Sequence, residues 1–264
     1  MSAVNVICLK WGKLYSPMFV NRLYRGVKSH LHRPFRFVCF TDDPTGLDEG
    51  IEAQPLPERP PEYVATPRYG DAWPNIYVKL ALYRPGLANL KGPTLFLDID
   101  QIVTGDLDCF FDYQPGEFCI VHNWMEFRKR LFRKLPFVGN SSCFRFEAGG
   151  PFDYVYNNWI KEMAASMDTK LYSTEQAYMT HAILAGGKVN WWPSDWVTSF
   201  KRSCTWFWPL NHILPPRLPK ATRILCFHGH PNPDEAIVGF KGSKHINGWT
   251  LPAPWVKDLW EVND

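Results

Sequence analysis

The sequence predicts an α/β fold: a mostly parallel, Rossmann-like sheet flanked by helices, followed by an irregular, aromatic-rich C-terminal portion. Up to residue 98, short apolar runs alternate with segments of helical spacing and with loops, which is the rhythm of a doubly wound parallel sheet. No internal repeat or low-complexity linker interrupts the 264 residues. We therefore expect one continuous domain.

Five elements are predicted in the first half of the chain. The strands are short runs rich in β-branched and aromatic residues, and the helices repeat apolar residues every three or four positions. In chain order they are a strand at residues 4–9, a helix at 17–30, a strand at 35–40, a helix at 76–83 and a strand at 94–97. Ligands of such sheets collect beyond the carboxyl ends of the strands, which draws attention to the residues after 97.

The second half of the chain is less regular. The same patterns predict strands at residues 118–121, 142–146, 188–191 and 223–227, and a helix at 174–185. Between residues 191 and 223, proline interrupts aromatic segments that fit neither pattern.

Composition excludes several classes of protein. Hydrophobic residues make up 45% and charged residues 21% of the chain, as in ordinary soluble globular proteins. A net charge of +3 is too small for a nucleic-acid footprint, and no apolar run is long enough to cross a membrane. The 7 cysteines form no C-x-x-C pair and sit mostly in apolar runs, which indicates buried thiols in a reducing compartment. We expect a cytoplasmic protein.

Two features leave alternatives open. Residues 127–137 carry five basic side chains among eleven, which fits a solvated helix face, or a patch that binds the inner face of a membrane or an anionic acceptor. The chain also holds 12 tryptophans. Trp191, Trp192, Trp196 and residues 206–208 fit either core packing or stacking platforms for a sugar acceptor.

The stretch Asp98-Ile99-Asp100 raises an electrostatic question. In an extended strand, residues i and i+2 point to the same face, so two carboxylates would lie side by side after an apolar run. Either a cation lies beside them or one of them is protonated. A bound Mg²⁺ or Mn²⁺ would resolve the repulsion, because both ions prefer carboxylate ligands. Asp106 and Asp108 repeat the spacing but follow a glycine in a turn, and we expect them to face solvent.

A histidine follows the last predicted strand. His228 stands beside a glycine, which permits close approach of the backbone to a ligand. An imidazole added to two carboxylates favours Mn²⁺ over ions that prefer oxygen alone. A purely structural His228 is the alternative, and His230 and His245 compete for the same role.

Six short motifs follow one another along residues 4–233. They are Lys10-Trp11-Gly12 with Tyr15, the predicted helix with Lys79, Phe96-Leu97-Asp98-Ile99-Asp100, Gly139-Asn140-Ser141-Ser142, Thr174-Glu175-Gln176, and Phe227-His228-Gly229-His230-Pro231. In this order they resemble nucleotide-sugar glycosyltransferases of the GT-A fold, nearest to glycosyltransferase family 8 and its bacterial relatives.

The resemblance implies a metal-dependent donor site. Asp98, Asp100 and His228 would hold Mn²⁺, or Mg²⁺, on the diphosphate of a UDP-sugar. The other implied donor contacts are Leu9, Lys10 and Tyr15 at the base and ribose, Lys79 and Ile99 at the motif acids, and Asn140, Ser141 and Ser142 at the sugar. Lys79, Glu175 and Gln176 would be the catalytic side chains.

The sequence also departs from the family pattern. The family's Asn-Ala-Gly reads Asn140-Ser141-Ser142, which implies a different sugar preference, and Glu175-Gln176 replaces an Asp-Gln pair beside the anomeric carbon. The family's C-terminal His-x-x-Gly-x-x-Lys-Pro lacks its lysine in residues 228–233. Another cation must then serve the diphosphate, and the candidates are Lys241, Lys244 and Arg223. Residues 239–249 fit a basic, glycine-rich lid or a plain surface loop.

The activity implied is transfer of a sugar from a UDP-sugar to a hydroxyl of a glycan or lipid-linked acceptor, with retention of configuration. For the retaining step we favour, as a hypothesis, front-face displacement. Residues 1–112 would form the nucleotide-sugar-binding half, and residues 113–264 the half that binds the acceptor and completes the metal site. Two alternatives remain. One is a catalytically silent sugar-binding protein on this fold, and the other is a haloacid-dehalogenase-type phosphatase, which also uses Asp-x-Asp after an apolar strand.

Overall fold

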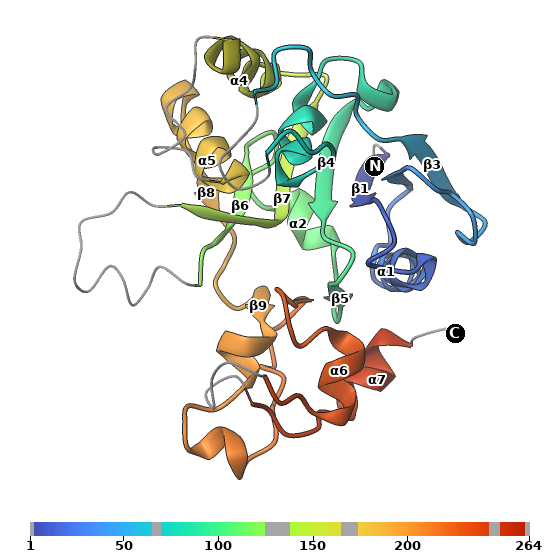
Figure 1. Ribbon diagram of the computed structural model, residues 1–264, viewed down its shortest axis with the longest axis vertical. Coiled ribbons are helices and arrows are strands. Elements are labelled where there is room, and N and C mark those ends of the chain that lie inside the picture. The colour runs from blue at the N-terminus through green and yellow to red at the C-terminus, as the bar shows by residue number, and fades with distance from the viewer. Residues whose placement is uncertain (1–2, 65–69, 125–137, 165–173, 243–248, 262–264) are drawn as a thin grey trace.

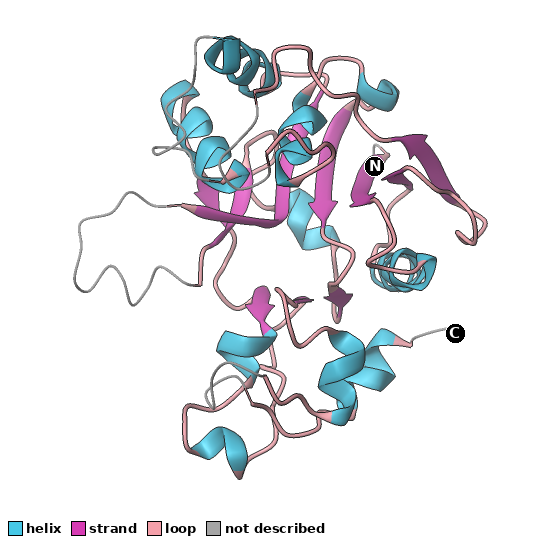
Figure 2. Cartoon of the chain, in the orientation of Figure 1, coloured by secondary structure: helices cyan, strands magenta, loops and turns pink. Residues whose placement is uncertain are grey.

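The computed structural model describes residues 3–64, 70–124, 138–164, 174–242 and 249–261. Within them the chain forms a seven-stranded sheet of order β3-β2-β1-β4-β7-β6-β8 and a three-stranded sheet of order β5-β10-β9. The large sheet and its helices form the upper part of Figure 1, and the small sheet opens a lower lobe. Figure 2 shows that loops make up much of the lower lobe.

The first half of the large sheet is parallel, as predicted. Strand β1 (Val4–Lys10) pairs with β2 (Phe35–Thr41) on one side and β4 (Gly92–Leu97) on the other, and β2 pairs with β3 (Ile51–Pro55). Helix α1 (Pro17–His30) connects β1 to β2 over the predicted range. Its proline stands in the first turn, where the missing amide hydrogen costs nothing.

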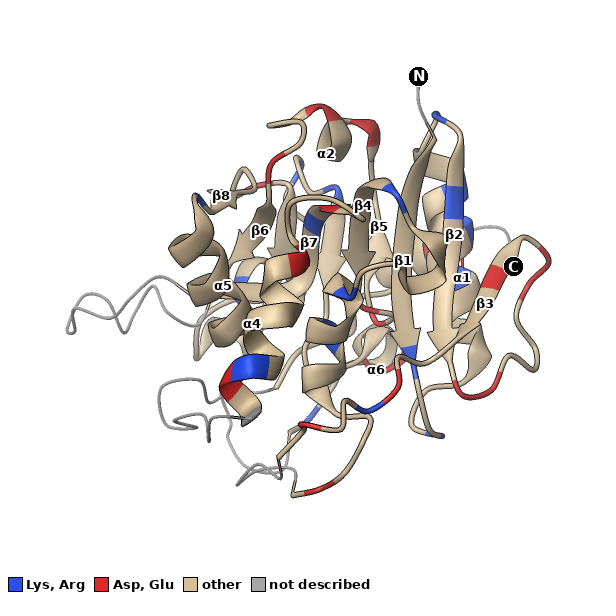
Figure 3. Ribbon diagram, turned by 90° about the horizontal axis from the view of Figure 1, so that it is seen from above, with Lys and Arg blue, Asp and Glu red and all other residues tan. Residues whose placement is uncertain are grey.

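The second half of the large sheet introduces two antiparallel pairings. Strand β7 (Gly139–Ala148) runs antiparallel to both β4 and β6 (Cys119–His122), while β6 pairs in parallel with β8 (Asn190–Trp191). Figure 3 shows the strands from β8 at one edge to β3 at the other. The sheet is therefore mixed but mostly parallel, which confirms the predicted fold class.

Two apolar cores cover the two faces of the large sheet. Along β1, Val6 and Cys8 enter one core while Ile7 and Leu9 enter the other, as the two-residue period of a strand requires. One core lies against α1 and the lower lobe. The other is closed by the 3₁₀-helix η1 (Ile76–Tyr83) and by helices α4 (Asp153–Ala164) and α5 (Glu175–Gly186).

The lower lobe is attached through β5 (Ile102–Val103), which starts two residues after Asp100. Strand β5 pairs antiparallel with β10 (Ile224–Cys226), and β10 pairs in parallel with β9 (Val197–Ser199). The remaining short helices are η2 (Leu87–Asn89), α2 (Asp108–Asp112), the π-helix η3 (Phe200–Cys204), η4 (Leu210–His212), α6 (Pro233–Val238) and α7 (Trp255–Trp260). The Asp-x-Asp segment is thus the link between the two sheets.

Several sequence-based expectations need comment. The element at 76–83 is a 3₁₀-helix and not an α-helix, and β3, β5 and β9 were not predicted. All seven cysteines are free thiols, and six are buried as expected. Residues 127–137 lie outside the described residues. None of the helices in the described part of the chain is long and apolar enough to cross a membrane.

A buried arginine holds the sheet to the loop after α2. The Arg145 side chain on β7 is fully buried, and its guanidinium donates hydrogen bonds to the backbone carbonyls of Phe110, Tyr113, Gln114 and Glu117. Burial lowers the pKa of Arg145, so the carbonyl dipoles must compensate a desolvated charge. No sequence pattern predicts this role of Arg145.

We expect Arg145→Met to lower the free energy of unfolding by about 3 kcal/mol, because four backbone carbonyls in buried or partly buried hydrogen bonds lose a charged donor. Urea denaturation followed by circular dichroism measures the change. Arg84→Met is the matched control, since Arg84 is exposed and its nitrogen lies 4.0 Å from Glu58. The control should cost less than about 0.5 kcal/mol, and an equal loss in both variants would contradict the assigned role.

Candidate active site

The Asp-x-Asp segment is a turn rather than the end of an extended strand. Strand β4 ends at Leu97, the amide of Asp98 donates to the carbonyl of Ser142 at 3.0 Å, and the amide of Gln101 donates back to the carbonyl of Asp98 at 3.2 Å. The prediction of alternating extended residues was therefore wrong in geometry. The two carboxylates still interact, because the charge of Asp98 raises the pKa of Asp100.

Each of the two acids is neutralised in its own way. The Lys79 ammonium lies 2.7 Å from Oδ1 and 3.0 Å from Oδ2 of Asp98, and the Lys79 side chain is only 10% exposed. Burial and then the charge of Asp98 raise the pKa of Asp100 to about 8, against the opposing charges of Lys79 and Lys201. At neutral pH Asp98 thus has a cation and Asp100 a proton, which answers the question that the sequence raised.

Lys79 joins four of the predicted site residues into one network. Its ammonium also donates to the carbonyl of Ser141 at 3.2 Å, and the Ser141 hydroxyl donates to Oε1 of Glu175 at 2.6 Å. The amide of Ser141 donates to Oε1 of Gln176 at 3.4 Å. Burial raises the pKa of the Glu175 carboxyl. The end of β4, the start of β7 and the first turn of α5 are held together by these bonds.

His228 lies beyond β10 with its ring fixed by neighbours. Its Nε2 is 2.6 Å from the hydroxyl of Ser199 at the end of β9, and Trp124 stacks on the imidazole with ring centroids 5.6 Å apart. Burial, followed by the charges of Lys201 and Arg202, lowers the pKa of His228 to about 4. The imidazole is therefore neutral at pH 7, the state in which histidine binds metals.

The competing histidines have other surroundings. His230 is exposed, and its Nδ1 lies 2.8 Å from Glu235 on α6. His245 lies outside the described residues.

Lys201, which the sequence reasoning missed, lies beside His228. Its ammonium donates to the backbone carbonyl of His228 at 2.6 Å and faces Gly229. Burial and then Arg202 lower the pKa of Lys201, while the charge of Asp100 raises it. The missing lysine of the C-terminal motif signalled that a cation was needed. The three-residue strand β9, which places Lys201, carried no recognisable pattern.

The other candidate cations lie elsewhere. Lys241 places its ammonium 5.2 Å from the centre of the Trp249 ring, and Arg223 donates to the carbonyl of Asp106 at 3.3 Å. Lys244 lies outside the described residues.

The remaining predicted donor contacts lie at the carboxyl ends of the central strands. Leu9 and Lys10 are buried at the end of β1, and Ile99 is buried in the turn after β4. Burial, then the charges of Asp100 and Asp98, raise the pKa of Tyr15 to about 12, so Tyr15 shares their electrostatic environment. Asn140 accepts a hydrogen bond from the Ser142 amide at 3.0 Å, which shapes the start of β7.

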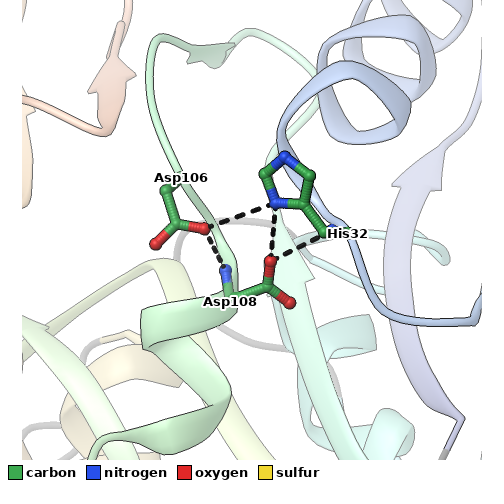
Figure 4. Close-up of side chains that lie close together, drawn as sticks. All are labelled: His32, Asp106 and Asp108. Atoms are coloured by element: carbon green, nitrogen blue, oxygen red, sulfur yellow. Dashed lines mark hydrogen bonds and ion pairs between the residues drawn. The ribbon is translucent and has the colours of Figure 1, made fainter. Parts of the chain in front are cut away.

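A separate cluster of His32, Asp106 and Asp108 corrects one expectation. Their ligand atoms lie within 4.8 Å of one another, and Figure 4 shows the three side chains converging. Asp108 does not simply face solvent: it bonds the His32 ring at 2.8 Å and Arg33 at 2.7 Å. Although burial opposes the effect, these bonds from Arg33 and His32 lower the pKa of Asp108 to about 2. Arg33 already supplies the positive charge that a metal ion would bring.

Among the described residues, His32, Asp106 and Asp108 are the only group of three His, Cys, Asp or Glu side chains whose possible ligand atoms all lie within 4.8 Å of one another. Asp98, Asp100 and His228 therefore do not form a closed three-ligand set in this structure. Two carboxyl groups and a neutral imidazole are nevertheless the donor types that a divalent cation takes, once Asp100 has lost its proton and the cation shares Asp98 with Lys79. Metal binding by the His228 Nε2 would replace its bond to Ser199.

No protein-family model matches the chain, and no curated protein matches it. The chain does match solved structures. The chain is similar to the galactosyltransferase LgtC in complex with donor and acceptor sugar analogs, with 14% identity, 98% of this chain and 95% of LgtC covered, and a TM-score of 0.56.

Two further solved structures are also similar to the chain. An active-site mutant of LgtC matches at 12% identity over 97% of this chain and 94% of its own, with a TM-score of 0.55. The bifunctional glycosyltransferase WbbM matches at 13% identity over 88% of this chain and 47% of its own, with a TM-score of 0.52. The chain has the GT-A fold of these glycosyltransferases, so the predicted fold and structural resemblance are confirmed.

Proposed function

We propose that this protein is a metal-dependent glycosyltransferase that moves a sugar from a nucleotide-diphosphate donor, a UDP-sugar, to a hydroxyl of a glycan or lipid-linked acceptor with retention of configuration. One observation carries the proposal. Asp98 and Asp100 lie at the carboxyl end of the central strand β4, in electrostatic contact with Lys79 and Lys201 and next to the strand that delivers His228. Ligands of open α/β sheets bind at this edge.

Asp98, Asp100 and His228 would hold the divalent cation, Mn²⁺ or Mg²⁺. The bound ion would supply Lewis-acid stabilisation of the departing diphosphate. The protein's own residues prepare the site: Lys79 fixes Asp98, and Ser199 and Trp124 fix the His228 ring. Leu9, Lys10 and Tyr15 would contact the nucleoside, and Asn140, Ser141 and Ser142 the sugar.

The hydrogen bonds of Glu175 support front-face displacement. A double displacement needs a carboxylate free to attack the anomeric carbon. The Glu175 carboxylate is buried and accepts the Ser141 hydroxyl, and Gln176 has no nucleophilic oxygen of comparable strength. In the proposed step the acceptor hydroxyl attacks from the side of the leaving group, and a diphosphate oxygen takes its proton. The surrounding cations stabilise the developing charge.

The donor reaction tests the proposal directly. A panel of nucleotide sugars with Mn²⁺ should show slow consumption of one UDP-sugar, and Asp100→Asn should lower that rate at least about 10²-fold. Asp106→Asn is the matched control, because Asp106 repeats the spacing outside the proposed site and should leave the rate unchanged.

Other outcomes of the same assay would support one of the two alternative functions. Release of phosphate from monoesters would indicate the phosphatase, and turnover of no substrate would indicate the silent sugar-binding protein. Nuclear magnetic resonance of the product reports the anomeric configuration. An inverted product would remove the retaining mechanism.

Metal binding should release a proton. With a pKa of about 8, Asp100 is mostly protonated at pH 7 and must ionise to bind a cation. Affinity for Mn²⁺ should therefore rise about tenfold per pH unit from pH 6 towards pH 8 and level off above it. His228 adds nothing in this range, since its pKa is about 4.

Titration calorimetry in buffers of different ionisation enthalpy measures the released proton. Asp100→Asn should abolish both the proton release and the pH dependence. Mn²⁺ affinity that stays constant between pH 6 and pH 8 in the unmodified protein would refute a role for Asp100 as a ligand.

We propose Lys201 as the cation that replaces the missing lysine at the diphosphate. It is half-buried beside the His228 carbonyl and senses the charge of Asp100, whereas Lys241 lies against Trp249. Lys201→Met should weaken UDP binding in the presence of Mn²⁺ about tenfold, the cost of one charged hydrogen bond.

Uridine provides the control for this experiment because it lacks the diphosphate. Its affinity should not change in Lys201→Met, and Lys201→Arg should retain most of the affinity for UDP. Equal losses for UDP and uridine would mean that Lys201 only supports the loop. Loss of UDP binding in Lys241→Met, with none in Lys201→Met, would return the role to Lys241.

The tryptophans considered for the acceptor have different surroundings. Trp192 is buried and packs against Phe110 and Tyr113, so it belongs to the core and is not a stacking platform. Trp191 stacks on His122 at the edge of the large sheet, with ring centroids 4.2 Å apart. We propose a lipid-linked acceptor at a cytoplasmic membrane face, with membrane contact through residues 127–137.

A further inference from the structure

The lower lobe ends in a turn that exposes a cluster of large apolar side chains. Phe207 is 74% exposed, Trp208 62%, Leu210 44% and Ile213 68%. Single exposed apolar residues are ordinary, but four within seven positions form a patch that calls for an explanation. We refer to residues 206–213 as the apolar turn.

Hydrogen bonds within the apolar turn and to the rest of the lobe hold its shape. The Leu214 amide donates to the Leu210 carbonyl at 2.8 Å, and the buried side chain of Asn211 donates to the Trp249 carbonyl at 2.8 Å. The Trp206 indole donates to the Pro215 carbonyl at 3.0 Å. Trp206 and Asn211 thus anchor the turn to the lobe, and the four apolar side chains are held outward.

The apolar turn belongs to a basic stretch of chain. Residues 196–223 contain five cationic side chains and neither aspartate nor glutamate. These cations are Lys201, Arg202, Arg217, Lys220 and Arg223. Arg217 lies over the Trp206 ring at 5.7 Å, and Lys241 lies over the Trp249 ring to which Asn211 is bonded. Positive charge therefore lies over Trp206 within the turn and over Trp249, to which the turn is bonded.

The position of the turn separates it from the proposed donor site. In Figure 1 the orange turn forms the lowest point of the lower lobe, at the end away from the tip of β4. An acceptor sugar stacked on this turn would lie at the end of the lower lobe that points away from β4 (Figure 1). This argues against the stacking role considered for residues 206–208.

We propose that the apolar turn docks the protein on an anionic lipid surface. Phenylalanine, tryptophan, leucine and isoleucine side chains with adjacent arginine and lysine are the composition that partitions into the boundary between headgroups and acyl chains. The apolar side chains enter this boundary, and Arg217, Lys220 and Lys241 lie at the level of the lipid phosphates. The proposal uses a surface distinct from residues 127–137 and does not depend on the proposed transferase activity.

Co-sedimentation of the full chain with vesicles tests the docking. The protein should bind phosphatidylcholine vesicles that contain phosphatidylglycerol, and Phe207→Ser/Trp208→Ser should weaken this binding about tenfold or more, because two inserted aromatic side chains are lost. Arg217→Gln/Lys220→Gln should weaken binding to the anionic vesicles and flatten its salt dependence. Brominated lipids should quench tryptophan fluorescence less in Trp208→Ser than in the unmodified protein.

Leu184→Ser is the matched control, since Leu184 is 47% exposed on α5. It should leave vesicle binding unchanged, and circular dichroism spectra equal to that of the unmodified protein would show that all variants are folded. Equal vesicle binding by Phe207→Ser/Trp208→Ser and the unmodified protein would overturn the proposal. So would an unmodified protein that is dimeric by sedimentation velocity and becomes monomeric in that variant, which would make the turn a protein interface.

Discussion

The repulsion between Asp98 and Asp100, which follow the apolar strand β4, is the constraint on which the surrounding structure depends. The structure meets the cost of burying like charges by pairing Asp98 with Lys79 and by keeping Asp100 protonated. Lys79 can reach Asp98 only because η1 packs against the large sheet with α4 and α5 behind it. Its second bond, to the Ser141 carbonyl, ties β7 near its start to the same ammonium.

The same segment joins the two sheets, and this brings residues distant in sequence towards the end of β4, where Lys201 acts electrostatically on Asp100. The turn ends β4 and leads within two residues into β5, which pairs with β10. The parallel pairing of β10 with β9 sets Ser199 opposite Cys226, two residues before His228. Lys201 follows Ser199 on η3. Movement of the lower lobe would therefore displace His228 and Lys201 together relative to Asp98.

The sequence predicted the elements that have a recognisable apolar period and the site residues that belong to motifs of charged side chains. Strand β1, helix α1, β4 and the first turn of α5 have patterns long enough to recognise, and the parallel order of the first strands followed from them. Strands β5 and β9 have two and three residues, too few for any period. Lys201 depends on β9 and so could not be found. Arg145 was missed because its partners are backbone carbonyls, which have no signature in the sequence.

Two departures from the family 8 pattern are bonded to each other in the structure. Serine stands at 141 where the pattern has alanine, and glutamate stands at 175 where it has aspartate. The hydroxyl of Ser141 donates to the Glu175 carboxylate at 2.6 Å, a bond that alanine cannot form. Without that donor, a buried glutamate would keep an unsatisfied charge or bind a proton. The two residues are therefore coupled, and a substitution at either position removes a bond of the other.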